Sequence, residues 1–299
     1  MTQLLNGVEI EDTFAEAFGM WAGRVIITAV NRKWAREAAN KMTGFATSII
    51  ACGCEAGIEG DLAETPDGRP GASVLVFAYS KDLLARHLVD RIGQCVLTCP
   101  TTACFSGLSA TEQVAVGSQL RFFGDTFQVS KVIGGKRYWR IPVMEGEFLV
   151  EEKFGVQRAV GGGNLLILGS DSGVTLQAAE LAVEAMRRVP GVILPFPGGM
   201  VRSGSKVGSR YKFLRASTND AFCPSLRGLV PTALPEGVNS VMEIVMDGLE
   251  VQPIEQATRL GIHAACIPGI RRISAGNYGG NLGKFKIYLH KVLGKAVLP

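Results

Sequence analysis

A single acidic residue, Glu243, lies within an otherwise apolar run of the chain. The run reads Val241-Met-Glu-Ile-Val-Met246, so apolar side chains flank the carboxyl group on both sides. If this run forms a buried strand, desolvation disfavours the ionised carboxylate and raises the pKa of Glu243. A carboxylic acid that is protonated near neutral pH can donate a proton to a leaving nitrogen. We therefore interpret Glu243 as a catalytic general acid. The alternative is a strand glutamate that points into solvent.

A long polar segment between Phe196 and Pro224 interrupts the apolar periodicity of the chain. Loops of this length usually carry function. Its glycines permit positive φ and close backbone approach, and its hydroxyls, amides and ammonium group can bind a ligand with many polar atoms. We therefore predict a substrate-binding wall. Its candidate residues are Gly198, Gly199, Ser205, Lys206, Gly208, Ser209, Ser217, Thr218, Asn219 and Asp220.

Two features of this polar segment allow a second interpretation. Asp220 either accepts a hydrogen bond from substrate or forms an Asx turn. The basic side chains near it form either a path for an anionic ligand or a solvated face that keeps the loop soluble. These basic residues are Arg202, Lys206, Arg210, Lys212 and Arg215.

The cysteines and histidines favour neither a metal site nor a nucleophile–base pair. The spacings Cys52/Cys54 and Cys95/Cys99/Cys104 are weak metal patterns without a nearby histidine, so we predict buried thiols and no metal. The histidines fall on predicted regular elements, two on helices (His87, His263) and one on a strand (His290). Cys223 is the alternative covalent nucleophile, although no suitable histidine partner is evident.

The remaining acidic and glycine-rich motifs have simpler interpretations. Acidic residues between Glu145 and Glu152 are typical of a solvated hairpin face. Gly161-Gly-Gly163 precedes a predicted strand instead of opening a helix, so it is not a dinucleotide fingerprint. Ser203-Gly-Ser-Lys206 also lacks the spacing of a phosphate-binding loop. Nucleotide binding is therefore not predicted.

Composition indicates a folded globular protein. The chain has 299 residues, of which 47% are hydrophobic and 19% charged, enough for one large core or two compact lobes. The net charge of +4 without a long basic run argues against nucleic-acid binding. No apolar run approaches about 18 residues and the N-terminal segment is acidic, so neither a membrane span nor a signal peptide is predicted. Seven cysteines, an odd number, fit a reduced, cytoplasmic protein.

Hydrophobic periodicity predicts four β-α-β units. The expected strands are residues 24–29, 45–50, 73–79, 94–98, 164–168, 192–194, 242–246, 272–274 and 284–290, and the expected helices are residues 33–42, 174–188, one capped by Ser80 and one opened by Pro253. Hairpins or an extra sheet are expected within residues 105–163. The pattern favours an α+β fold with two ferredoxin-like lobes, residues 1–145 and 146–299.

Several longer motifs are spread over nearly the whole chain. They are Asn6–Phe18, Glu64–Gly71, Asp90–Cys95, Phe196–Gly199, Ser205–Ser209, Ala216–Ala221 and Ser274–Asn277. In these motifs the chain resembles the formylmethanofuran:tetrahydromethanopterin formyltransferases. The resemblance implies two ferredoxin-like lobes, a cytoplasmic oligomer and no tightly bound cofactor. It also carries the catalytic glutamate of the family onto Glu243.

The resemblance further implies the substrates and partners. A formyl group would move between the amine of a methanofuran-type carrier and N5 of a tetrahydromethanopterin-type pterin. The chain lacks the strongly acidic composition of salt-adapted archaeal members and has an inserted-looking stretch from Ser225 to Ala233. It is similar to the form in methylotrophic bacteria, where the formyltransferase joins formyl-hydrolysing subunits. A complex of that kind is therefore an alternative to a homotetramer.

Such a transfer fits the residues at hand. If both carriers bind together, the accepting amine attacks the formyl carbon directly and no enzyme nucleophile is required. Backbone N–H groups of the polar segment would stabilise the oxyanion, and Glu243 would move the proton between nitrogens. Two alternatives remain open: an acyltransferase that uses Cys223 as nucleophile, and a non-catalytic assembly subunit that only binds a carrier.

Overall fold

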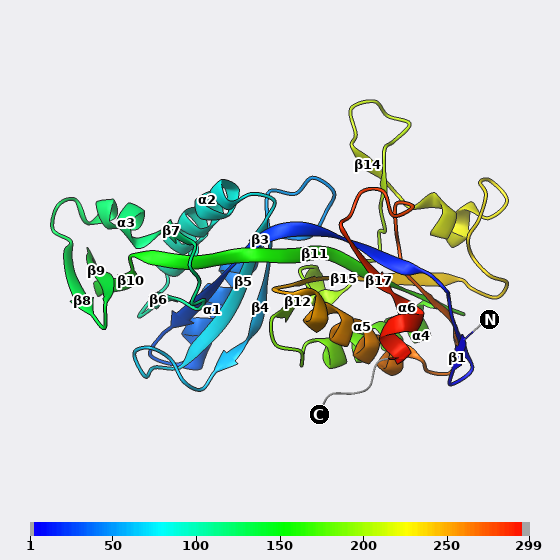
Figure 1. The fold of residues 1–299 in the computed structure, drawn as a ribbon, viewed down its shortest axis with the longest axis horizontal. Helices are drawn as coiled ribbons and strands as arrows, with labels where there is room; N and C mark the ends of the chain where they lie inside the picture. Colours follow the sequence, from blue (N-terminus) through cyan, green and yellow to red (C-terminus); the bar gives the residue numbers. More distant parts are fainter. Residues whose placement is uncertain (1–2, 295–299) are drawn as a thin grey trace. The chain divides into compact units, whose positions relative to one another are not determined.

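The computed structural model of the chain describes residues 3–294, which divide into two compact units (Figure 1). The first unit comprises the chain up to Gly19, residues Ser48–Cys52 and the chain from Val160 onward. The second unit comprises Met20–Thr47 and Gly53–Ala159. Two long strands, β3 (Phe14–Thr28) and β11 (Lys153–Gly169), contribute residues to both units.

The first unit is built on a sheet in which strands neighbour one another in the order β12-β15-β11-β16-β2-β1. All these pairs are antiparallel except β16 with β2. Strand β17 pairs separately with β3. The strands are β1 (Gln3–Leu5), β2 (Val8–Ile10), β12 (Val192–Ile193), β15 (Ser240–Gly248), β16 (Ile270–Ser274) and β17 (Phe285–Tyr288).

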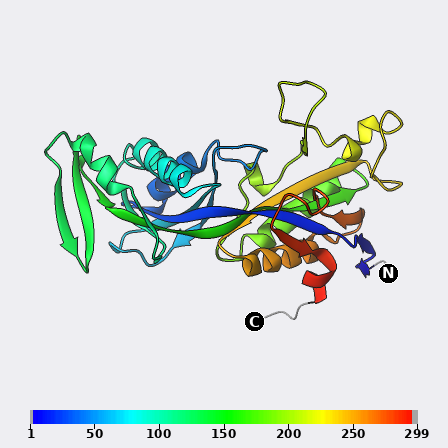
Figure 2. The same ribbon diagram turned by 45° about the horizontal axis from the view of Figure 1, so that its top comes forward.

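Helices cover one face of β15 in this unit (Figure 2). They are α4 (Ser172–Met186) and α5 (Val251–Ala265), whereas the short α6 (Leu289–Gly294) packs on α5 and β17. Helix α4 begins after Asp171, whose side chain accepts a hydrogen bond from the Val174 N–H. Small residues of α4, including Ala178 and Ala182, are fully buried, which lets α4 and α5 pack closely together. Their apolar residues and the sheet form a continuous core.

The second unit has the strand order β4-β5-β3-β6-β10-β9-β8, in which only β6 and β10 are parallel. Strand β7 pairs separately with the start of β11. Helices α1 and α2 pack on β5 and begin at the cap residues Asn31 and Ser80. The strands are β4 (Glu55–Leu62), β5 (Gly71–Ala78), β6 (Ala103–Ser106), β7 (Gln113–Ala115), β8 (Val129–Ile133), β9 (Lys136–Val143) and β10 (Gly146–Glu151). The helices are α1 (Arg32–Thr43), α2 (Lys81–Arg91) and α3 (Gly117–Leu120).

The α+β class and the hairpins between residues 105 and 163 are confirmed, but three predicted strands are wrong in whole or part. Residues 45–50 form no strand, because Phe45 adopts φ +56° and is fully exposed. Residues 94–98 belong largely to a π-helical segment, Ile92–Val96, that continues α2 without a break. The last strand ends at Tyr288, and Leu289 begins α6, so His290 lies on a helix.

The predicted division of the chain at residue 145 remains a prediction. Both compact units are discontinuous along the sequence, since the first takes in residues from both ends of the chain. The outermost residues of the predicted lobes, 1–2 and 295–299, lie outside the described residues. Between residues 3 and 294, none of the helices combines the length and apolar character that a membrane crossing requires.

Candidate active site

Glu243 lies on β15 at the edge of a pocket in the first unit. Alternate residues of this strand, such as Ile244 and Met246, belong to the core beneath the helices, so Glu243 and Val241 face the opposite side. The Glu243 backbone exchanges two hydrogen bonds with Val201, at 2.7 and 2.9 Å, which brings the polar segment against the strand.

We call this cavity, of about 300 Å³, the Glu243 pocket. It is formed by strand residues and by two stretches of the polar segment. Its lining residues are Leu166, Val201, Arg202, Ser203, Gly204, Asn219, Phe222, Cys223, Pro224, Ser225, Val241 and Glu243.

A neutral amide holds the Glu243 carboxylate from the adjacent strand. The Asn164 side chain on β11 donates from Nδ2 to Glu243 Oε1 at 2.8 Å. Its other end accepts the Gly276 N–H at Oδ1, also at 2.8 Å. Burial raises the pKa of Glu243, and the hydrogen bond from Asn164 opposes part of that rise. The carboxyl group is therefore suited to exchange protons nearer neutrality than an ordinary glutamate.

A second carboxylate, Glu16 on β3, fixes the loop that supplies Gly276. Glu16 is almost fully buried and accepts hydrogen bonds from four backbone N–H groups, those of Tyr278, Gly280, Leu282 and Gly283. Burial alone would raise the pKa of Glu16, but these four donors lower it overall, so the side chain is ionised. The pKa of the Tyr278 hydroxyl is raised mainly by burial and further by the negative charges of Glu243 and Glu16.

Most of the predicted substrate wall lies outside the Glu243 pocket. Of the ten loop residues predicted from the sequence, Asn219 alone lines the pocket. Lys206 and Ser217 lie on a two-stranded ladder formed by β13 (Lys206–Val207) and β14 (Ala216–Ser217), of which β14 is labelled in Figure 1. Lys206 forms an ion pair with Asp220 at 2.6 Å, which lowers the pKa of Asp220. The ladder thus ties predicted binding residues to one another.

Other loop residues have local partners. The Ser217 hydroxyl donates to the Gly208 carbonyl at 2.8 Å, and Ser209 Oγ accepts the Tyr211 N–H at 3.0 Å. Thr218 Oγ1 lies 3.3 Å from Cys223 Sγ. Ser205 is exposed. The binding role of these residues remains a prediction.

The two glycines predicted to contact substrate, Gly198 and Gly199, differ in how closely other atoms surround them. Both lie in the 3₁₀ turn Pro197–Gly199 with positive φ, +66° at Gly198 and +90° at Gly199. A Cβ atom at Gly199 would lie 2.9 Å from a methyl carbon of Val183 on α4, so this glycine permits close packing of the turn on the helix. A Cβ atom at Gly198 would meet open space.

The alternative nucleophile, Cys223, has neutral neighbours. Its Sγ lies 3.4 Å from the Asn219 carbonyl oxygen, in addition to the contact with Thr218. The histidines lie on α2, α5 and α6. His290 contacts the Ile10 carbonyl through Nε2 at 2.8 Å, so its ring serves the packing of α6.

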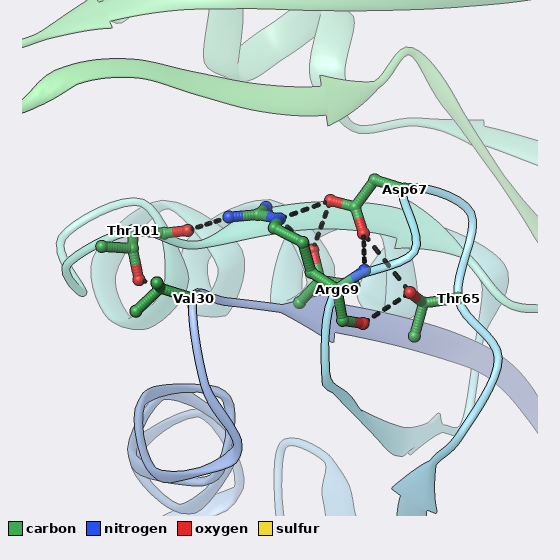
Figure 3. Close-up of polar contacts among 6 residues, drawn as sticks. Val30, Thr65, Asp67, Arg69 and Thr101 are labelled. Atoms are coloured by element: carbon green, nitrogen blue, oxygen red, sulfur yellow. Dashed lines mark hydrogen bonds and ion pairs between the residues drawn. The ribbon is translucent and has the colours of Figure 1, made fainter.

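A second pocket, of about 380 Å³, lies within the second unit and we call it the Arg69 pocket. Arg69 is held by Asp67, by the Thr28 hydroxyl and by the Thr101 carbonyl (Figure 3). The same turn is closed by Thr65, which donates to the Arg69 carbonyl. The two carboxylates that line the Arg69 pocket also have partners: Glu145 accepts a hydrogen bond from the Thr101 N–H, and Glu147 forms an ion pair with Arg140.

Sequence reasoning singled out Glu243, whose catalytic role remains a prediction, but it did not identify the groups that hold the side chain in place. In the sequence Asn164 is only the end of a glycine run, and Glu16 and Tyr278 carry no local signal of a site. Asn164 and Gly276 are 112 residues apart, and Glu16 and Gly283 are 267 apart. Only the folded sheet brings these pairs together.

Comparison with known proteins identifies the family. The family model of formylmethanofuran–tetrahydromethanopterin formyltransferase matches residues 3–143, and the model of the proximal lobe of the same enzyme matches residues 146–292. The chain belongs to this formyltransferase family. The resemblance recognised from the sequence motifs is thus confirmed, and with it the prediction of an enzyme that transfers a formyl group.

Relatives in this family align over almost their whole length. A formylmethanofuran–tetrahydromethanopterin formyltransferase of Methylococcus capsulatus is 62% identical, covering 97% of this chain and 99% of the relative. One subunit of the formyltransferase/hydrolase complex of Methylorubrum extorquens is 50% identical, covering 97% of both chains.

Solved structures of the family have the same fold. The formyltransferase from Methanosarcina barkeri matches with a TM-score of 0.92 and 48% identity, over 97% of this chain and all of the other. The formyltransferase/hydrolase complex from Methylorubrum extorquens, solved with methylofuran, matches through one of its chains with a TM-score of 0.95 and 49% identity, over 99% of this chain and all of that one.

Proposed function

We propose that this chain moves a formyl group directly between a methanofuran-type amine carrier and N5 of a tetrahydromethanopterin-type pterin, with Glu243 as the proton carrier. The observation that supports this role is the place of Glu243. Glu243 lines a pocket, burial raises the pKa of its carboxyl group, and the side-chain hydrogen bond that this group accepts comes from a neutral amide. Such a carboxyl group can both accept and return a proton.

The reaction balances without a covalent enzyme intermediate. The accepting nitrogen attacks the formyl carbon, a new C–N bond forms, and the tetrahedral intermediate carries an oxyanion. Glu243 takes the proton that the attacking nitrogen must lose and gives it to the leaving nitrogen as the old C–N bond breaks. The carboxyl group returns to its starting state, so neither a metal nor a redox partner is required for the balance.

Positioning and charge stabilisation supply the remainder of the rate. Holding both carriers in one complex converts a bimolecular step into an intramolecular one. Backbone N–H groups of the glycine- and serine-rich segment are the proposed oxyanion donors, and one such donor typically contributes about 3–4 kcal/mol. The residues predicted to contact the carriers are Gly198, Gly199, Ser205, Lys206, Gly208, Ser209, Ser217, Thr218, Asn219 and Asp220.

The names of relatives support the substrates and partners. They are called formyltransferases of formylmethanofuran and tetrahydromethanopterin, and one belongs to a formyltransferase/hydrolase complex solved with methylofuran. We therefore expect an oligomer, with a complex containing formyl-hydrolase subunits as one form of it. The cytoplasmic location remains a prediction.

The two-lobe architecture is part of the same proposal. In the first unit the order β16-β11-β15-β12, with α4 and α5 as crossovers, supports a ferredoxin-like lobe. In the second unit the order β6-β3-β5-β4, with α1 and α2, supports another.

A formyl-exchange assay tests this function. The purified chain, alone and with any co-purified complex, is mixed with both carriers, and formyl transfer is followed in each direction. We expect transfer that requires both carriers together. Binding of a carrier without transfer in either preparation would favour the assembly subunit. A formyl-enzyme trapped with one carrier alone would favour Cys223 as a nucleophile.

A further inference from the structure

We infer that Asn164 is a positioning residue, which sets the orientation and the proton affinity of Glu243 through an amide whose direction is fixed by the Gly276 backbone. This inference deepens the proposed function and rests on it only for the kinetic consequence. The contact between Asn164 and Glu243 exists whether or not Glu243 carries the proton in catalysis.

The direction of the Asn164 amide follows from its two partners. The Gly276 N–H can only donate, so the atom of Asn164 that it meets at 2.8 Å must be the carbonyl oxygen. The NH₂ group then necessarily faces Glu243, where it donates at 2.8 Å. A donor in this place stabilises the ionised carboxylate more than the neutral acid.

The Gly276 N–H is itself held in place by the loop that follows it. Residues 278–283 of this loop are bound to the Glu16 carboxylate through four backbone donors. Gly276 also needs to be a glycine, because a Cβ atom there would lie 2.6 Å from Asn164 Nδ2. Two strands and one loop therefore fix the amide before any substrate arrives.

Few other groups compete with Asn164 for control of Glu243. Arg202 and Cys223 line the same pocket, and Tyr278 of the loop lies near both Glu243 and Glu16. On the strands of the sheet, Asp247 of β15 accepts the Gly162 N–H, and β16 carries Arg271 and Arg272, of which Arg272 pairs with Glu9. The helices lie behind the other face of β15, where Ile244 and Met246 point. The causes that act on the pKa of Glu243 are burial and the Asn164 hydrogen bond, in opposite directions.

Two substitutions distinguish this role from simple packing. Asn164→Ala removes the donor, so Glu243 should titrate at higher pH. Asn164→Asp has nearly the same shape and keeps an acceptor for the Gly276 N–H, but it sets a second carboxyl group against Glu243. Two carboxyl groups at hydrogen-bond distance share one proton, so the upper titration step of the pair should rise further than in Asn164→Ala. A packing role predicts the reverse order, because Asp fills the space and Ala does not.

The experiment uses the full chain with ¹³C-labelled glutamate carboxyl groups, titrated by NMR without substrate. Glu243→Gln identifies the Glu243 signal. The matched control is Asn239→Ala, which removes another asparagine hydrogen bond in the same unit, 3.1 Å to the Ser170 carbonyl. We expect the titration of Glu243 to move upward in Asn164→Ala, further in Asn164→Asp, and not in Asn239→Ala. Equal shifts in all three variants, no shift, or a larger shift in Ala than in Asp would overturn the inference.

Kinetics separate this inference from the proposed function. In each variant, kcat is measured against pH with both carriers saturating. The pH limb that Glu243→Gln abolishes should move with the NMR titration, and kcat near neutral pH should fall by about tenfold or more in Asn164→Ala, since a hydrogen bond to a charged group is lost. If the NMR titration moves and the kinetic limb does not, Asn164 controls Glu243 but Glu243 is not the proton carrier.

Discussion

The Glu243 pocket of the first unit and the Arg69 pocket of the second both contain charged groups, but the two pockets balance charge differently. In the Arg69 pocket the guanidinium faces Asp67 and two oxygen acceptors, and Glu147 has its own arginine. In the Glu243 pocket the carboxyl group receives a hydrogen bond from a neutral side chain, and burial raises its pKa. Charge that is compensated stabilises a turn, whereas charge that is only partly compensated is available for proton transfer.

The largest effect is expected when one carboxyl group in each pocket is replaced by an amide, because only the carboxyl group of the Glu243 pocket is proposed to carry a proton. Glu243→Gln should fold normally and lose about 100-fold or more of the transfer rate, because an amide cannot carry the proton. The matched variant Glu145→Gln, in the Arg69 pocket, should keep the wild-type rate. Turnover with both carriers is measured after circular dichroism has established folding. Similar losses in both variants, or in neither, would contradict the distinction.

Removing the guanidinium should affect stability and leave catalysis intact. Arg69→Met keeps the apolar stem but removes the guanidinium donors to Asp67 and to the buried Thr28 hydroxyl, whereas the hydrogen bond from Thr28 to Asp67 remains. Because Arg69 is partly exposed and solvent screens the pair, we expect a loss of about 1 kcal/mol in the free energy of unfolding. Urea denaturation measures it, with Arg188→Met, which breaks an exposed ion pair with Glu184, as the near-neutral control. A fall in kcat for the folded Arg69→Met chain would show that the Arg69 pocket takes part in the reaction.

Lys206 sharpens the comparison within the first unit, because it is a paired charge close to the Glu243 pocket. If it also attracts an anionic carrier, Lys206→Ala should raise the KM for that carrier about threefold, and the difference should shrink as salt screens the wild type. Asp220→Asn should have the opposite effect, since it frees the ammonium group from its ion pair. KM values for both carriers at low and high ionic strength provide the test. Unchanged values throughout would assign Lys206 to the loop structure alone.

The smallest effect is expected at Cys223. Its thiol lines the Glu243 pocket, and its contacts with Thr218 and the Asn219 carbonyl are both with neutral groups. Cys223→Ala should therefore retain activity within about twofold, because direct transfer has no covalent step. Mass spectrometry of the wild type with one formylated carrier should detect no adduct. Ping-pong kinetics or a thioester at this cysteine would overturn direct transfer.

The sequence was most informative where local pattern and burial agree. The apolar run around Glu243 predicted a strand and a raised pKa from one short segment, and the structure has both, with the Glu243 side chain half-buried. Ser80 likewise predicted the start of α2, because its side chain caps the Leu83 N–H. These features depend on neighbours only a few residues away.

Pattern failed where the outcome depends on distant contacts. Residues 45–50 are apolar enough for a strand, but Phe45 and Ile49 are exposed and the chain turns there instead. The run from Gln94 to Thr98 has strand-like composition, yet it follows α2 directly and continues its helical hydrogen bonding. Short apolar runs do not distinguish these alternatives. The hydrogen bond from Asn164 to Glu243 could not be predicted from the sequence for a related reason, because the Asn164 amide is oriented by the Gly276 N–H, 112 residues away in the chain.

The contact between Glu16 and four backbone N–H groups near the C-terminal end of the described chain affects the order in which the protein can fold during synthesis. Glu16 lies near the start of the chain, but its four donors are translated 262 to 267 residues later, and β2 likewise pairs with β16. Chains emerge from the ribosome N-terminus first, and domains commonly fold as they emerge. The segments of the second unit are complete once Ala159 has emerged, whereas the first unit must wait for its closing strands. Residues 3–19 therefore leave the ribosome long before their partners exist. A message truncated before β16 would yield a polypeptide that contains Asn164 and Glu243 but lacks the Gly276 N–H and all four backbone donors to Glu16.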